Sequence, residues 1–148
     1  MPCHPYRVYG KGAVPMGESA ESVVRAVLEA WRNPRIDDLM SFFGDDATYT
    51  DGPRGVFRGR DAIKSELEAQ LRMGFCVQSL DVTSLVAERG TVMLERNDKF
   101  TVAGQPFAME LMAVFEIDPN GRIERWREYY DLKSATDPIK EAGFRVPS

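Results

Sequence analysis

Two strands predicted from the sequence carry charged residues on the face that should be buried. Between residues 91 and 102, apolar and polar side chains alternate, and the apolar set also contains Arg96 and Asp98. Between residues 122 and 132, the set that holds Trp126 and Tyr130 also contains Glu128. Side chains two positions apart in a strand point to the same side of a sheet. These charged groups are therefore expected to face the core.

Tyr49 and Asp51 extend this set, because they share one face of a short strand predicted over residues 47–51. An ionised group that is buried alone costs several kcal/mol, so inward charges must find partners. We expect Arg96 to lie between Asp98 and Glu128 and to pair with both.

The charge balance of this cluster favours chemistry over a purely structural role. One arginine cannot neutralise three carboxylates, so the remaining negative charge should raise the pKa of at least one carboxyl group and leave a shared proton. General acid–base catalysis needs a carboxyl group in that state. The alternative is a buried ion cluster that only fixes the register of the sheet.

Helices are predicted first along the chain, and the strands that hold the cluster mostly follow them. Apolar spacing predicts a helix over residues 18–32 and a third helix over about 61–71. Between them it predicts a short second helix, whose apolar stripe includes Phe43 and which ends at Gly44. After a loop at 52–55, alternation predicts strands over 75–88, 91–102, 107–117 and 122–132, the first bent near Ser79. A last helical segment is expected at 137–142.

This order of elements predicts an α+β fold, with helices packed on one side of a curved antiparallel sheet. Residues 1–17 show no periodicity and are expected to form a flexible N-terminal arm, whereas residues 18–148 are expected to form a single domain. A chain of 148 residues is close to the usual size of one domain.

Composition excludes several classes of function. The chain has 19 basic and 23 acidic residues, a net charge of −4, so nucleic acid and anionic membranes are poor candidates for a partner. One histidine leaves no His-rich zinc site and no Ser–His–Asp triad. Cys3 and Cys76 have no metal spacing and fit a cytoplasmic protein. No nucleotide-binding or metalloprotease motif is present, so no cofactor and no metal are expected.

The segments around the inward charges resemble those of the limonene-1,2-epoxide hydrolase family, part of the larger SnoaL/NTF2-like cone-fold group. The resemblance covers roughly residues 18–133. It rests on three motifs, which are Tyr49-Thr50-Asp51, Glu95-Arg96-Asn97-Asp98 and Trp126-Arg127-Glu128-Tyr129-Tyr130-Asp131. It implies an NTF2-like cone, in which three to four helices pack on one side of a strongly curved, mixed or antiparallel sheet. It also implies a homodimer formed through the exposed face of the sheet.

The family's mechanism implies a role for each inward residue. Tyr49 matches a tyrosine that holds the attacking water, Arg96 a bridging arginine, and Asp98 the acid that protonates the epoxide oxygen. Asp51 stands where the family usually has an asparagine, and Glu128 where it usually has the aspartate base. A protonated Asp51 could both donate and accept, as asparagine does, so we expect Asp51 to share a proton with Glu128.

The pocket wall is expected to be apolar and to suit a small terpene, alicyclic or aryl epoxide. Its predicted residues are Leu28, Trp31, Leu71, Phe75, Val77, Phe100, Met109, Leu111, Trp126 and Tyr130. With the catalytic set Tyr49, Asp51, Arg96, Asp98 and Glu128, they predict an epoxide hydrolase that adds water without a covalent intermediate.

Two other readings of the same residues stay open. The first is a SnoaL-like or ketosteroid-isomerase-like isomerase or cyclase that uses the carboxylates on a polyketide or steroid-like compound. The second is a non-catalytic module of the same fold that binds a small molecule. The inward Arg-x-Asp pair argues against the second reading, because a binding module has no need to bury it.

Overall fold

The computed structural model describes residues 19–134 of the chain, which form three α-helices, one 3-10 turn and six strands. The helices are α1 (Ala20–Arg32), α2 (Ile36–Met40) and α3 (Arg60–Arg72), and the 3-10 turn is η1 (Gly52–Arg54). The strands are β1 (Phe43–Asp51), β2 (Val56–Arg58), β3 (Phe75–Glu88), β4 (Thr91–Val102), β5 (Gln105–Ile117) and β6 (Ile123–Tyr129).

All six strands form one sheet in the order β2-β1-β6-β5-β4-β3. The strands pair antiparallel except β1 and β6, which run parallel, so the sheet is mixed. The parallel pairing places Asp51 opposite Glu128 and Tyr49 opposite Trp126. Residues that are far apart in the sequence thus become neighbours on one face of the sheet.

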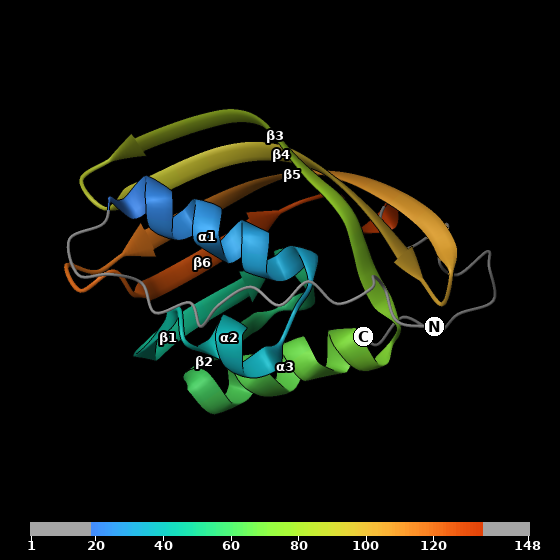
Figure 1. Cartoon of the computed structure of the whole chain (residues 1–148), viewed down its shortest axis with the longest axis horizontal. Helices are drawn as coiled ribbons and strands as arrows, with labels where there is room; N and C mark the ends of the chain where they lie inside the picture. The colour runs from blue at the N-terminus through green and yellow to red at the C-terminus, as the bar shows by residue number, and fades with distance from the viewer. Residues whose placement is uncertain (1–18, 135–148) are drawn as a thin grey trace.

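The sheet curves strongly and wraps around α1, while α2 and α3 lie below it beside β1 and β2 (Figure 1). The helix α1 buries the apolar side that its spacing predicts, including Val24, Leu28 and Trp31. Its first turn is capped by Ser19, whose hydroxyl oxygen accepts a hydrogen bond from the backbone N–H of Ser22 at 3.2 Å. The predicted α+β fold, with a mixed curved sheet and helices on its inner side, is confirmed.

Strand β4 alternates between buried and exposed side chains along almost its whole length. A two-residue turn at Arg89 and Gly90 precedes it, and both residues have a positive φ, as a tight hairpin of matching twist requires. The register of β3 against β4 shifts between Val77 and Ser79, which confirms the bend predicted there.

Several predicted boundaries are wrong. Gly44 does not end the second helix but lies inside β1, which begins at Phe43 and is longer than predicted. The backbone of β1 at Gly44 lies close to β6, and a Cβ there would lie 3.4 Å from the carbonyl oxygen of Ile123. The strand β2 was not expected, and β6 ends at Tyr129 rather than at residue 132.

The expected N-terminal arm, residues 1–17, and the expected C-terminal helical segment, residues 137–142, lie outside the described residues. Within residues 19–134, no helix is long and apolar enough to cross a membrane.

Candidate active site

Arg96 joins two carboxylates in the interior of the sheet. Its Nε donates to both oxygens of Asp98, at 2.8 and 3.0 Å, and its Nη2 donates to Oε1 of Glu128 at 2.6 Å. The side chain of Arg96 is only 2% exposed, and each carboxylate is 7% exposed. The predicted contacts of Arg96 with Asp98 and Glu128 are therefore present, and we call these three residues the Arg96 cluster.

Glu128 meets two further donors on the same sheet. The indole Nε1 of Trp126 donates to Oε1 of Glu128 at 3.2 Å, whereas the hydroxyl of Tyr49 lies 3.4 Å from Oε2. The second distance is long for an O–H···O hydrogen bond, which is usually 2.7–2.8 Å. The Oε2 atom of Glu128 thus keeps most of its capacity to accept another hydrogen bond.

Asp51 belongs to a second set of contacts, which the sequence did not reveal. Its Oδ1 accepts a hydrogen bond from the Tyr130 hydroxyl at 2.8 Å. Its Oδ2 accepts one from Gln70 at 3.3 Å and forms an ion pair with Arg54. Arg54 also pairs with Glu66 at 2.8 Å. We call these five residues the Arg54 cluster.

The Arg54 cluster corrects the charge balance that the sequence suggested. Arg96 is not the only cation for three carboxylates, because Arg54 lies directly against Asp51. No hydrogen bond joins Asp51 to Glu128 within the described part of the chain, although the two residues are opposite each other across β1 and β6. Each arginine instead bridges two carboxylates of its own.

Burial raises the pKa of all three carboxyl groups that were predicted from the sequence. For Asp51, the charge of Glu128 raises the pKa further and Arg54 opposes the rise. For Glu128, the pKa rise is opposed by Arg96 and reinforced by Asp98. For Asp98, burial outweighs the opposing effect of Arg96 on the pKa. For Glu128 and Asp98, a raised pKa suits a group that exchanges a proton during a reaction.

The arginine and the two tyrosines stay in their protonated forms. Burial lowers the pKa of the Arg96 guanidinium, but the charges of Glu128 and Asp98 outweigh it and raise this pKa. Burial, followed by the charge of Glu128, raises the pKa of Tyr49. Burial and the charge of Asp51 raise the pKa of Tyr130. Both phenols therefore act as hydrogen-bond donors rather than as bases.

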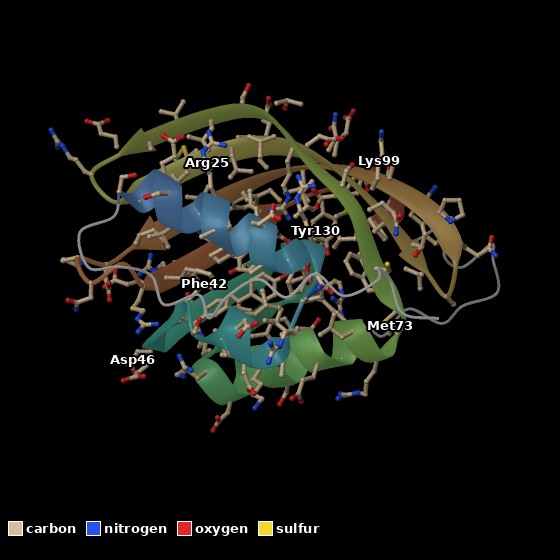
Figure 2. The ribbon with its side chains drawn as sticks, viewed as in Figure 1. Arg25, Phe42, Asp46, Met73, Lys99 and Tyr130 are labelled. Carbon is tan, nitrogen blue, oxygen red and sulfur yellow. The ribbon has the colours of Figure 1, made fainter. Side chains whose placement is uncertain are left out.

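Both clusters open onto one cavity inside the curved sheet. The cavity measures about 810 Å³, including the part of its mouth that is open to solvent, and its exposed wall is mostly apolar. Tyr130 lies in the middle of the molecule, and Met73, another residue of the wall, lies near the end of α3 (Figure 2). The wall is formed by Trp31, Tyr49, Asp51, Arg54, Gln70, Met73, Phe75, Arg96, Asp98, Phe100, Val102, Met109, Trp126, Glu128, Tyr130 and Leu132.

Ten wall residues were predicted from the sequence, and the structure places six of them in the wall. These six are Trp31, Phe75, Phe100, Met109, Trp126 and Tyr130. Leu28, Val77 and Leu111 are instead buried in the core away from the cavity, and Leu71 on α3 is only half-buried and lies outside the wall. Alternation shows which face of a strand is buried, but it does not show which buried residues border a cavity.

Arg54 and Gln70 are the polar wall residues that the sequence did not single out. Arg54 lies in a turn without periodicity, and Gln70 lies beside the apolar stripe of α3, so no pattern marked them. One signal was available for Gln70, because Glu66 and Gln70 are four residues apart and must share a side of the helix. Among residues 19–134, no three His, Cys, Asp or Glu side chains are grouped as metal ligands would be.

Comparison with known proteins assigns this chain to a family. Residues 24–126 match the family model of the SnoaL-like domain. The chain belongs to the SnoaL-like family. This span covers both the Tyr49 strand and the Arg96 strand, and it ends two residues before Glu128.

Solved structures of several other proteins share the fold. A limonene-epoxide-hydrolase-like epoxide hydrolase of Mycobacterium tuberculosis is 24% identical, with a TM-score of 0.70 over 82% of this chain and 90% of that one. A candidate polyketide cyclase of Xanthomonas campestris is 22% identical, with a TM-score of 0.65 over 77% and 91%. SalBIII, an epoxide hydrolase/cyclase-like enzyme of salinomycin pyran-ring formation, is 16% identical, with a TM-score of 0.67 over 78% and 92%. At these identities the likenesses show the NTF2-like fold, which hosts several reactions.

Proposed function

We propose that this SnoaL-like protein is an epoxide hydrolase, which adds water to a small hydrophobic epoxide and releases a vicinal diol. The observation that carries this proposal is the Arg96 cluster, in which one buried arginine bridges two carboxylates at the wall of an apolar cavity. Opening an epoxide in one step needs a base for the water and an acid for the leaving oxygen. Two carboxyl groups joined by an arginine can divide those roles.

Glu128 is the proposed base. Its Oε1 is held by Arg96 and Trp126, which fixes the carboxylate, and its Oε2 has only the long contact with Tyr49. A water bound against Oε2 can accept a hydrogen bond from the Tyr49 hydroxyl, because that hydroxyl can turn away from its long contact. The water is then held between a donor and the base.

Asp98 is the proposed acid. Its raised pKa favours the protonated form, which can donate to the epoxide oxygen. As the water oxygen bonds to one epoxide carbon, that carbon's bond to oxygen breaks, a water proton passes to Glu128 and the Asp98 proton passes to the released alkoxide. Proton exchange with solvent then restores both carboxyl groups, and no ester with the protein forms.

The cavity favours a terpene, alicyclic or aryl epoxide. Its aromatic wall includes Trp31, Phe75 and Phe100, and Phe75 stacks on Phe100 with ring centroids 4.6 Å apart. Its wall combines apolar side chains with a few polar groups, as sites that hold small organic ligands usually do. A hydrocarbon ring on the wall would leave the epoxide facing the carboxyl groups.

The alternative proposal is an isomerase or cyclase reaction at the same carboxyl groups, which adds no water. The observation that favours it is the likeness to a candidate polyketide cyclase and to SalBIII. The Tyr49 hydroxyl beside a free acceptor of Glu128 favours hydrolysis, because that pair can hold a water.

A panel of epoxides with chromatographic detection of diols tests the proposal. Limonene oxide, cyclohexene oxide and styrene oxide represent the three substrate classes. We expect at least one diol from the wild-type protein, and a loss of at least about 100-fold in kcat/KM in Glu128→Gln. The amide in this variant can still accept from Arg96 and Trp126, so its fold should persist. A rearranged product of the same mass as the epoxide would favour the isomerase alternative.

We also propose that the protein forms a homodimer through the outer face of its sheet. Met93, Met112 and Tyr129 point away from the core there and are about half exposed. Met112 is paired with Tyr129 across β5 and β6. Large apolar side chains gathered on an exposed sheet face are typical of an interface.

A further inference from the structure

The reaction proposed above assigns no role to the Arg54 cluster. It collects residues from the end of β1, from η1, from α3 and from the residue that follows β6, and its members Asp51, Arg54, Gln70 and Tyr130 line the cavity. Glu66 supports it from behind, because it contacts both Arg54, at 2.8 Å, and Gln70, at 3.0 Å. The side chains of Arg54 and Glu66 are only 18% and 10% exposed.

Every described contact of the Asp51 carboxylate comes from a donor. Tyr130 donates to Oδ1, and Arg54 and Gln70 donate to Oδ2. An ionised carboxylate accepts about four hydrogen bonds and donates none. Three are in place, so one acceptor position is left for a group in the cavity. A protonated Asp51 would carry its own O–H at this fourth position and could no longer accept a hydrogen bond there.

The backbone leaves room for this arrangement. Gly52 follows Asp51 with a φ of +48°, and a Cβ there would lie 2.5 Å from Cε1 of Tyr130. Only glycine lets the Tyr130 ring lie against the chain at this point, with its hydroxyl 2.8 Å from Asp51. The turn that carries Arg54 and the position of Tyr130 therefore depend on the same residue.

We propose that Arg54 is a positioning residue that keeps Asp51 as an ionised acceptor for the attacking water, an inference that rests on the hydrolase activity proposed above. The water then donates one hydrogen to Glu128 and the other to Asp51, and accepts a hydrogen bond from Tyr49. Its remaining lone pair attacks the epoxide carbon. This replaces the expectation that Asp51 shares a proton with Glu128.

The charged and titratable groups around Asp51 are Tyr49, Arg54, Glu66, Glu128 and Tyr130. Arg54 is the only cation among these groups. Its removal should leave Asp51 beside two other carboxylates, so that Asp51 takes up a proton at higher pH. An opposite charge at close range typically moves a carboxyl pKa by 1–3 units.

The test follows the titration of Asp51 directly, without any substrate. In protein labelled with ¹³C at the aspartate carboxyl carbons, the Asp51 signal is the one that disappears in Asp51→Asn. We expect its midpoint to rise by at least about one pH unit in Arg54→Gln and to stay near the wild-type value in Arg54→Lys. An unchanged midpoint in a folded Arg54→Gln protein overturns the proposal.

Kinetics separate this proposal from the proposed function. With an epoxide that gives diol, the acidic limb of the kcat/KM profile should move to higher pH in Arg54→Gln, with little change in KM. Tyr130→Phe should lower kcat about tenfold or more, whereas Tyr129→Phe, on the exposed neighbour, should match the wild type.

A wild-type profile in both Arg54→Gln and Tyr130→Phe overturns the positioning role and leaves the hydrolase proposal intact. If no epoxide reacts but the NMR midpoint moves, the hydrolase proposal fails while the control of Asp51 by Arg54 stands.

Discussion

Glu128 and Asp51 lie opposite each other on neighbouring strands, yet the two carboxylates have different surroundings. Glu128 accepts from Arg96 and Trp126 through one oxygen and leaves the other nearly free. Asp51 accepts through both oxygens. A carboxylate with a free oxygen can take a proton, whereas one held by three donors can orient a water. This difference underlies the two roles that we propose.

The raised pKa of Glu128 has a consequence for stability. The carboxyl group of Glu128 binds its proton more tightly in the folded chain than in the unfolded chain. The resulting contribution to the free energy of unfolding is fully present below the ordinary glutamate pKa of about 4.3, and it is lost as the pH rises through the folded-state pKa. Glu128→Gln removes the titration.

We therefore predict that Glu128→Gln becomes more stable relative to wild type as the pH rises from about 4 to 8. Chemical denaturation at several pH values measures the difference in unfolding free energy. Glu124→Gln, at an exposed position of the same strand, is the matched control and should show no such trend. A constant difference between Glu128→Gln and wild type across this range would contradict the burial effect assigned to Glu128.

At the scale of elements, alternation in β4 and β6 was enough to find the Arg96 cluster. A strand places every second residue on one face, so Arg96, Asp98 and Glu128 had to point inward. The Arg54 cluster could not be found in this way, because it is formed by a turn and a helix around the end of a strand. Its partners become neighbours only when η1 and α3 fold against β1.

Gly52 follows β1, begins η1 and lies against the Tyr130 ring, so its substitution tests whether the position of Tyr130 matters for activity. Gly52→Ala places a methyl group where the Tyr130 ring lies and should displace the Tyr130 hydroxyl from Asp51. We predict a loss of about tenfold or more in kcat/KM, because a shift of about 1 Å near a reacting group can cost up to 100-fold. Gly104→Ala is the matched control, since Gly104 also has a positive φ but has open space around its Cβ position. Gly104→Ala should lose some stability because of the positive φ but keep its activity.

At the scale of the whole molecule, the order of helices and strands was enough to predict an α+β fold, whereas the order of strands in the sheet was not. The parallel pairing of β1 with β6 joins the first and last strands of the described chain, and no local pattern in the sequence encodes it. The wall of the cavity could likewise be predicted only in part from local patterns. Leu28, Val77 and Leu111 are buried as predicted, but they lie in the core rather than in the wall.

The proposed homodimer is tested by charge on the outer face. Met112→Asp places a charge in the centre of the exposed apolar group, which should dissociate the dimer. Light scattering after gel filtration should give a dimer mass for wild type and a monomer mass for the variant. Val56→Asp is the control, because Val56 is similarly exposed but lies on β2, an edge strand away from Met112. A wild-type protein that is monomeric at micromolar concentration would exclude this interface.

The direct addition of water by the Arg96 cluster is tested most directly by one turnover in ¹⁸O-labelled water, with enzyme in excess over an epoxide. If Glu128 activates the water, the diol carries one ¹⁸O atom, and the peptides that contain Asp51, Asp98 and Glu128 carry none by mass spectrometry. Label in any of these peptides, with unlabelled oxygen in the diol, would instead show a covalent ester intermediate. That result would contradict the mechanism derived from the free oxygen of Glu128.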